Sequence, residues 1–192
     1  MKKVLLVFIL IFSISSLFSQ SNSDGGETRA ERNAEFNKRP FKDKLAFGGE
    51  LSIFLGTTSY INISPFIGYR INPDITFGIG PSYQYWAQRF ASGPNGVNRT
   101  HIYGGRIFVR HELGKMFFLH AEYEVLNLQD YNVSFGLVRV NVNMAGAGIG
   151  YKSAFSESSY YYIMALFDFI QDPRSIYPLS PIIFKVGFMF GK

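Results

Sequence analysis

The side chains best equipped for chemistry lie in one stretch, His101 to Val125. Five of its ionisable residues share even-numbered positions: Arg106, Arg110, His120, Glu122 and Glu124. A histidine beside carboxylates can transfer protons or bind a metal ion, and carboxylates beside arginines form ion pairs. Same-face residues of one strand lie about 6–7 Å apart, too far for three of them to converge on one ion. We therefore predict ion pairs here, with no metal site and no cofactor.

Acyl-transfer chemistry would need a serine beside His120. No serine occupies an even-numbered position in this stretch, and Ser52 and Ser82 share only the parity. His101 and His111 fall at opposite ends of the first half of the stretch. We predict that the protein is not an enzyme.

The same stretch predicts a β-hairpin with two unlike faces. Its odd-numbered positions are apolar: Tyr103, Ile107, Val109, Phe117, Leu119, Ala121, Tyr123 and Val125. A period of two is typical of strands, and Glu112-Leu113-Gly114-Lys115 reads as the turn between them. A soluble protein would bury the apolar face, whereas a membrane barrel would turn it to lipid and enclose the charges.

Composition favours one all-β domain. The chain has 192 residues, with 20 Phe, 12 Tyr and 19 Gly, which suits many strands and turns. The absence of cysteine excludes a disulfide framework and thiolate metal sites. The net charge of +5 is small and scattered, so we expect no nucleic-acid partner.

The N-terminal segment predicts export. Met1–Ser19 has two lysines, an apolar run and then small residues, the order of a signal peptide cleaved after Ser19. The alternative is an uncleaved anchor, but the run is short for a spanning helix. Gln20–Lys44 is polar with mixed charge, and we expect a flexible periplasmic arm in which Glu27–Lys38 can form a short helix.

From Leu45 onward, alternation predicts eight strands, two of them in the hairpin. The other six are Leu45–Leu55, Tyr60–Ile71, Ile75–Gln88, Val138–Tyr151, Tyr160–Ile170 and Ile182–Phe190. Three longer loops are expected at Phe90–Asn98, Asn127–Leu137 and Asp172–Ser180.

Three local irregularities are expected within these strands. The sixth strand reverses parity, which puts Arg139 on the enclosed face. Glycines at Gly146–Gly150 predict a bulge, and Pro65 and Pro81 predict kinks because proline cannot donate to the ladder.

Eight strands of about ten residues predict an all-β, eight-stranded antiparallel up-and-down transmembrane β-barrel over residues 45–192. Such a barrel is just wide enough for side chains, so enclosed charges must pair. By parity the interior charge network is Glu50, Arg70, Arg106, Arg110, His120, Glu122, Glu124, Arg139, Asp168 and Lys185.

Three features together resemble a known family. They are a leader ending in Ser19-Gln20, the run ISPFIGYRINPDITFGIGPSYQY from Ile63 to Tyr85, and FKVGFMF from Phe184 to Phe190 with its alternating aromatics. The chain from Leu45 to Lys192 resembles small outer-membrane β-barrel proteins of Bacteroidota-type bacteria, broadly similar to OmpA, OmpX and OmpW. The resemblance implies an outer-membrane location and insertion by the barrel-assembly machinery, and it carries over no catalytic residue.

We therefore expect an outer-membrane barrel with a closed, charged interior and a structural or surface-interaction role. The alternatives are a narrow channel or carrier for small or hydrophobic molecules, a lipid-modifying outer-membrane enzyme, and a soluble lipocalin-like barrel. Its expected partner is outer-membrane lipid, and we expect a monomer. The sequence does not indicate a surface ligand.

Overall fold

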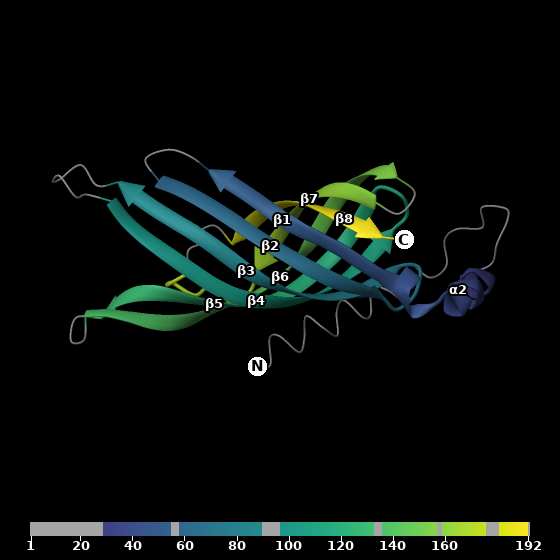
Figure 1. Cartoon of the computed structure of the whole chain (residues 1–192), viewed down its shortest axis with the longest axis horizontal. Coiled ribbons are helices and arrows are strands. Elements are labelled where there is room, and N and C mark those ends of the chain that lie inside the picture. The colour runs from purple at the N-terminus through teal and green to yellow at the C-terminus, as the bar shows by residue number, and fades with distance from the viewer. Residues whose placement is uncertain are drawn as a thin grey trace.

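The computed structural model describes residues 29–54, 58–89, 97–132, 136–156, 159–175 and 181–191. The predicted leader and the first part of the arm, residues 1–28, lie outside this set. Eight strands form one closed barrel in chain order, each antiparallel to the next, with β8 returning to β1 (Figure 1). They are β1 Leu45–Phe54, β2 Thr58–Arg70, β3 Ile75–Arg89, β4 Val97–Leu113, β5 Phe117–Asn132, β6 Gly136–Ser156, β7 Ser159–Asp168 and β8 Ile182–Gly191. The predicted all-β, eight-stranded up-and-down fold is confirmed.

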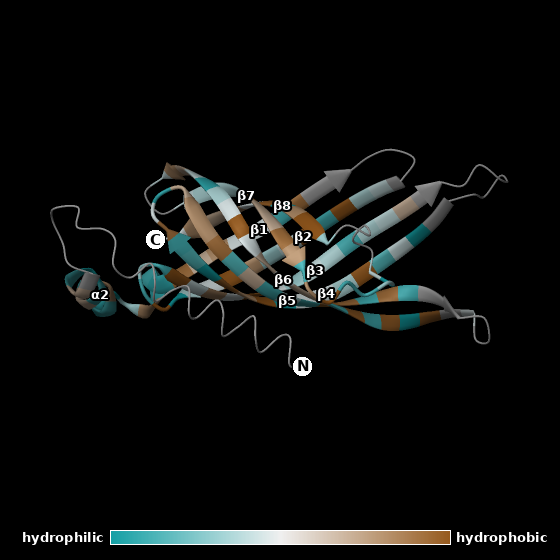
Figure 2. Cartoon of the chain, turned by 180° about the vertical axis from the view of Figure 1, so that it is seen from behind, coloured by the Kyte–Doolittle hydropathy of each residue, from teal (hydrophilic) through white to brown (hydrophobic). Residues whose placement is uncertain are grey.

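The apolar side chains of the strands point outward. On β8, Phe184, Val186, Phe188 and Phe190 are 70%, 51%, 41% and 47% exposed, while Lys185 between them is 3% exposed. The same alternation runs around the barrel, with Phe47, Ile67, Ile107 and Ile163 all about half exposed. Figure 2 shows the resulting bands of hydrophobic and hydrophilic residues along the strands. The barrel is therefore apolar outside and partly charged inside.

Aromatic rings fill the interior near the α2 end of the barrel, and each ring lies over a glycine. Each ring stands directly opposite a glycine on the neighbouring strand: Phe66 and Gly48, Phe108 and Gly78, Phe118 and Gly150, Tyr162 and Gly187. A Cβ added to any of these glycines would come within 3.0 Å of the facing ring. The glycines thus make room for the rings, and the four pairs occupy alternate seams, from β1–β2 to β7–β8.

The barrel wall is taller on one side. The β5–β6 pairing continues to Asn132↔Gly136, whereas β6–β7 begins only at Gly146↔Asp168 and β4–β5 only at Tyr103↔Asn127. The β5–β6 hairpin therefore stands clear of its neighbours, at the end of the barrel away from α2 (Figure 1). The prediction of a loop over Asn127–Leu137 was wrong, because most of that range is strand.

The predicted parity reversal in the sixth strand was also wrong. Val142 and Met144 point inward and are each 1% exposed, whereas Arg139 and Asn141 lie exposed on the outer face. The register of β5 and β6 continues without a shift. In the part of β6 that extends away from α2, the outer face of the barrel is polar. The apolar side chains of that part therefore lie on the sheltered inner face.

Glycine and proline have milder effects than expected. Pairing on both sides of β6 runs unbroken through Gly146–Gly150, and the register shifts instead between Ala154 and Ser156. Pro65 and Pro81 lie at facing positions of β2 and β3, where the pairing is interrupted between Ile63↔Tyr83 and Ile67↔Ile79 with no change of register. Because the two prolines face each other, the positions without a backbone N–H donor fall at a single point of the ladder, and no bulge forms.

The described part of the N-terminal arm is docked on the barrel. It forms α2, Arg29–Lys38, and a short 3-10 helix, Phe41–Lys44, which leads into β1. Phe36 is buried, and Arg32 binds both carboxylate oxygens of Asp74 in the β2–β3 turn at 3.1 and 2.9 Å. The predicted short helix is confirmed over Arg29–Lys38, but this part is not a solvated tail. Within the described residues, no helix has the length and apolarity to cross a membrane.

Candidate functional site

A cluster of charged side chains occupies the middle of the barrel. Its members come from four strands that meet only because the barrel closes, and each is at most 5% exposed: Glu50 on β1, Arg106 on β4, His120, Glu122 and Glu124 on β5, and Lys185 on β8. We call these six residues the central cluster. Strand alternation places every one of them on the inner face.

Opposite charges alternate within the central cluster. Arg106 pairs with Glu50 and lies 3.5 Å from Glu122. Lys185 pairs with Glu122 and lies 3.5 Å from Glu50 and 3.8 Å from Glu124. Each of these two cations therefore bridges carboxylates of different strands, which ties β1, β4, β5 and β8 together across the interior.

His120 is a packed member of this cluster. Its Nε2 lies 3.1 Å from Glu122 Oε2, and its ring stacks on Phe108 at 5.1 Å between centroids. The hydroxyl of Ser82 donates to Glu124 at 2.5 Å, and that of Ser64 donates to Asn62 at 2.7 Å. No hydrogen bond joins Ser64 or Ser82 to His120, and the side chain of Ser52 lies outside the described set. The described residues also contain no group of three or more His, Asp or Glu that could hold a metal ion.

Arg110 lies below the central cluster in an aromatic cage. Its guanidinium carbon is 4.3 Å from the Phe118 ring centroid and 4.1 Å from that of Tyr162. It also donates to the Tyr160 hydroxyl at 3.3 Å, and its Nε lies 3.5 Å from His120 Nδ1. Ring faces attract a cation strongly where water is excluded. Aromatic faces thus take the place that a carboxylate takes beside Arg106.

The structure places the remaining predicted residues apart from one another. Asp168 is buried near the outer end of β7, where its carboxylate accepts the backbone amides of Ile170 at 3.0 Å and Ala145 at 3.4 Å. Arg70 is half-buried at the opposite end of the barrel, where α2 lies. Arg139, predicted inside, lies outside, where it donates to Asn127 and stands over the Tyr103 ring at 5.5 Å.

Sequence reasoning missed a second polar group below the Arg110 cage. Glu112 pairs with Lys152 and accepts a hydrogen bond from the Tyr160 hydroxyl at 2.8 Å. Glu112 had been assigned to a turn, although it continues the even-numbered series of Arg106 and Arg110. That continued parity was the signal that could have found it.

Apolar layers lie on both sides of the central cluster. Toward the end away from α2 lie Ile102, Leu126, Leu128 and Val142, and toward the α2 end lie Phe66, Phe108, Phe118 and Met189, all at most 5% exposed. Charges held between two apolar layers are shielded from water. The arrangement can therefore fix strands together.

Outside the strands, Asp172 forms a local turn with Arg174. The Arg174 side chain and backbone amide donate to the Asp172 carboxylate at 2.9–3.1 Å, and these bonds lower the pKa of Asp172 below its usual range. An exposed pair of this kind contributes little to stability.

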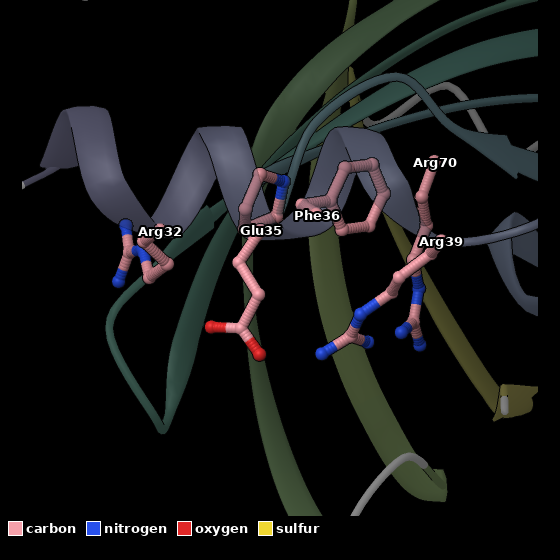
Figure 3. Close-up of a pocket in the computed structure, with 6 residues that line it drawn as sticks. Arg32, Glu35, Phe36, Arg39 and Arg70 are labelled. Atoms are coloured by element: carbon pink, nitrogen blue, oxygen red, sulfur yellow. The ribbon is translucent and has the colours of Figure 1, made fainter.

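A second candidate site lies at the end of the barrel where α2 meets the β2–β3 turn. A cavity of about 310 Å³ is lined by Arg32, Glu35, Phe36, Arg39, Arg70 and Pro73 (Figure 3). Three of the six lining residues are arginines, so the cavity is strongly basic. Of these, only Arg70 had been singled out, because sequence alone does not show that α2 docks beside it.

Comparison with known proteins gives no family. No family model matches the chain, and no curated protein matches it. Among solved structures, the barrel is similar to the N-terminal β-barrel domain of Pseudomonas aeruginosa OprF, with 13% identity and a TM-score of 0.46, over 79% of this chain and 98% of that one.

Proposed function

We propose that the protein is an outer-membrane β-barrel with a closed interior and a structural or surface-interaction role. The observation that carries the proposal is the inverted arrangement of its side chains, apolar outside and charged inside. A soluble barrel would leave few large apolar side chains in water. Here such side chains encircle the barrel.

The dimensions of the apolar belt suit a bilayer. On β4 the outward apolar residues run from Tyr103 to Leu113, so the belt spans ten residue steps. At about 3.3 Å per step and a tilt of about 40°, this gives a height of about 25 Å, the usual height of the apolar band on such barrels. Barrel closure also satisfies the backbone hydrogen bonds, which hydrocarbon requires.

Export to the outer membrane fits the predicted leader, Met1–Ser19. The sequence resemblance to Bacteroidota barrels supports the same location. Insertion by the barrel-assembly machinery belongs to this proposal as well.

The packing of the interior favours a plug over a channel. The central cluster is internally paired, and apolar layers cover it on both sides. An ion crossing the barrel would have to displace the caged Arg110 and the rings around it. The network therefore acts as a brace between strands.

The outer end offers a surface for interaction. The β5–β6 hairpin rises beyond the belt, and its outward residues Gln129, Arg139 and Asn141 are exposed and polar. A hydrogen-bonded strand pair that extends into water presents a rigid polar surface. The surface role, with a partner that the chain itself does not name, rests on this hairpin.

Membrane fractionation with a gel assay tests the proposal. The full-length protein should be recovered in the outer-membrane fraction, and its migration on a detergent gel should change on boiling, because a folded barrel resists detergent until heated. Recovery as a soluble periplasmic protein, with identical migration before and after boiling, would contradict it.

A further inference from the structure

We propose that the basic cavity between α2 and the β2–β3 turn binds the phosphate headgroup of an anionic phospholipid in the periplasmic leaflet. This inference rests on the proposed outer-membrane location. We call the lining residues Arg32, Glu35, Phe36, Arg39, Arg70 and Pro73 the α2 pocket.

Two of the three arginines in the α2 pocket are available for a ligand. Arg32 is held by its two bonds to Asp74. The side chains of Arg39, which follows α2, and Arg70, which ends β2, form no ion pair or side-chain hydrogen bond with the described residues. Figure 3 shows both side chains extending to the same side of α2.

Neighbouring like charges favour an anion between them. Two guanidinium groups repel each other, and a bound anion removes that repulsion. The flat fork of arginine matches phosphate oxygens in a bidentate manner. Glu35 is the one acid that lines the pocket, against three arginines, so the pocket keeps an excess of positive charge.

The surroundings of the α2 pocket point to a lipid. Arg70 ends β2 at the rim of the barrel, and its sequence neighbours Tyr69 and Ile71 point to the outer face, where Ile71 is 56% exposed. Phe41 stacks on Tyr69 at 5.3 Å between ring centroids and is itself 64% exposed. A phosphate on Arg39 and Arg70 would therefore have apolar side chains beside it, where its acyl chains can lie.

The size of the cavity suits a headgroup. A volume of about 310 Å³ is at the lower end of small-molecule sites, which hold about 300–1,000 Å³. It is too small for two acyl chains but sufficient for a glycerophosphate group. The pocket would thus hold the headgroup while the chains stay on the outer face of the barrel.

Native mass spectrometry of the full-length protein in neutral detergent tests this inference. The probes are phosphatidylglycerol, phosphatidylcholine and inorganic phosphate. We expect preferential retention of phosphatidylglycerol, and the double variant Arg39→Gln/Arg70→Gln should reduce that retention at least about tenfold, because it removes both charge-assisted contacts with the phosphate. Lys115→Gln removes one charge from the exposed β4–β5 turn and should retain as much lipid as the unmodified protein.

Three results would overturn the inference. They are equal retention of phosphatidylglycerol by the double variant, equal retention of phosphatidylcholine and phosphatidylglycerol, and displacement of the lipid by an equal concentration of inorganic phosphate. The last would mean that the pocket takes a free anion. Gel migration of the same samples separates this failure from that of the proposed function: a normal heat-dependent shift with unchanged lipid retention overturns the pocket alone, whereas no shift in any sample overturns the membrane barrel.

Discussion

At the scale of single residues, the interior is arranged so that no cation of the central cluster stands without a carboxylate. Arg106 and Lys185 each contact carboxylates from two strands. Strand alternation in the sequence was sufficient to predict that these residues lie inside. It could not predict which residue pairs with which, because the partners are brought together only by closure of the barrel.

Arg106→Ala should lower the stability of the barrel markedly. The substitution leaves Glu50 and Glu122 buried with less compensation, and loss of one partner from a buried ion pair costs about 3–5 kcal/mol. Denaturant unfolding in lipid vesicles measures the effect.

Arg139→Gln is the matched control for that substitution. Arg139 lies exposed on the outer face, so the free energy of unfolding should change by about 0.5 kcal/mol or less. If the two variants were equally stable, the central cluster would not brace the barrel.

At the scale of elements, neighbouring strands are fitted together by rings that lie over glycines. Their even-numbered positions place Phe108 and Phe118 on the inner face of the predicted hairpin, and the facing glycines, Gly78 and Gly150, lie on neighbouring strands. The sequence shows no sign that each ring would face a glycine, because that depends on the register between strands.

Gly150→Ala should destabilise the barrel by about 1–3 kcal/mol, the usual cost of overpacking. The added Cβ would meet the Phe118 ring at less than 3.0 Å. Phe118→Leu in the same chain should recover part of the loss. Thermal unfolding followed by gel migration measures each variant.

Gly105→Ala provides the comparison, since its added Cβ would have as its nearest neighbour the Gly80 carbonyl oxygen at 3.8 Å. Its midpoint temperature should match that of the unmodified protein. Equal effects at Gly105 and Gly150 would argue against fitting of rings to glycines.

The apolar belt makes a third prediction. Ile107→Lys puts a charge on the outward face of β4 in the middle of the belt, where it should cost about 2–4 kcal/mol in a bilayer. Gln129→Lys makes the same charge on the exposed outer part of β5 and should cost about 0–1 kcal/mol. Refolding into vesicles under denaturant compares them, and a similar cost at both positions would mean that Ile107 does not face lipid.

The sixth strand shows where sequence periodicity misleads. The apolar residues of its outer half occupy the inner face, and those of its lower half occupy the outer face, as Val142 and Ile149 illustrate. Periodicity reports which face is sheltered, so the apparent parity changes where the strand leaves the belt. Arg139 lies outward because it is beyond the end of the apolar belt. A single sequence does not show where that belt ends.

At the scale of the whole molecule, the sequence predicted the number of strands, their direction and the inversion of faces. These features follow from alternation repeated along the chain. It did not predict the docking of α2, because Arg32 lies in an arm without a periodic pattern and meets Asp74, 42 residues further on, only in the folded chain. The basic pocket beside α2 therefore emerged only from the structure.

At this scale, the molecule is a closed barrel filled by its own side chains, which the proposed function places across a bilayer. Aromatic rings close the lower interior, paired charges occupy the middle, and apolar residues lie above them. Our central claim is that these side chains leave no path for ions through the barrel.

Recording in a planar bilayer tests that claim most directly. Full-length protein whose folded state has been verified by heat-dependent gel migration should insert and produce no conductance above the background of the membrane. Discrete conductance steps whose size changes in Glu122→Gln would contradict it, because they would show that ions pass through the central cluster.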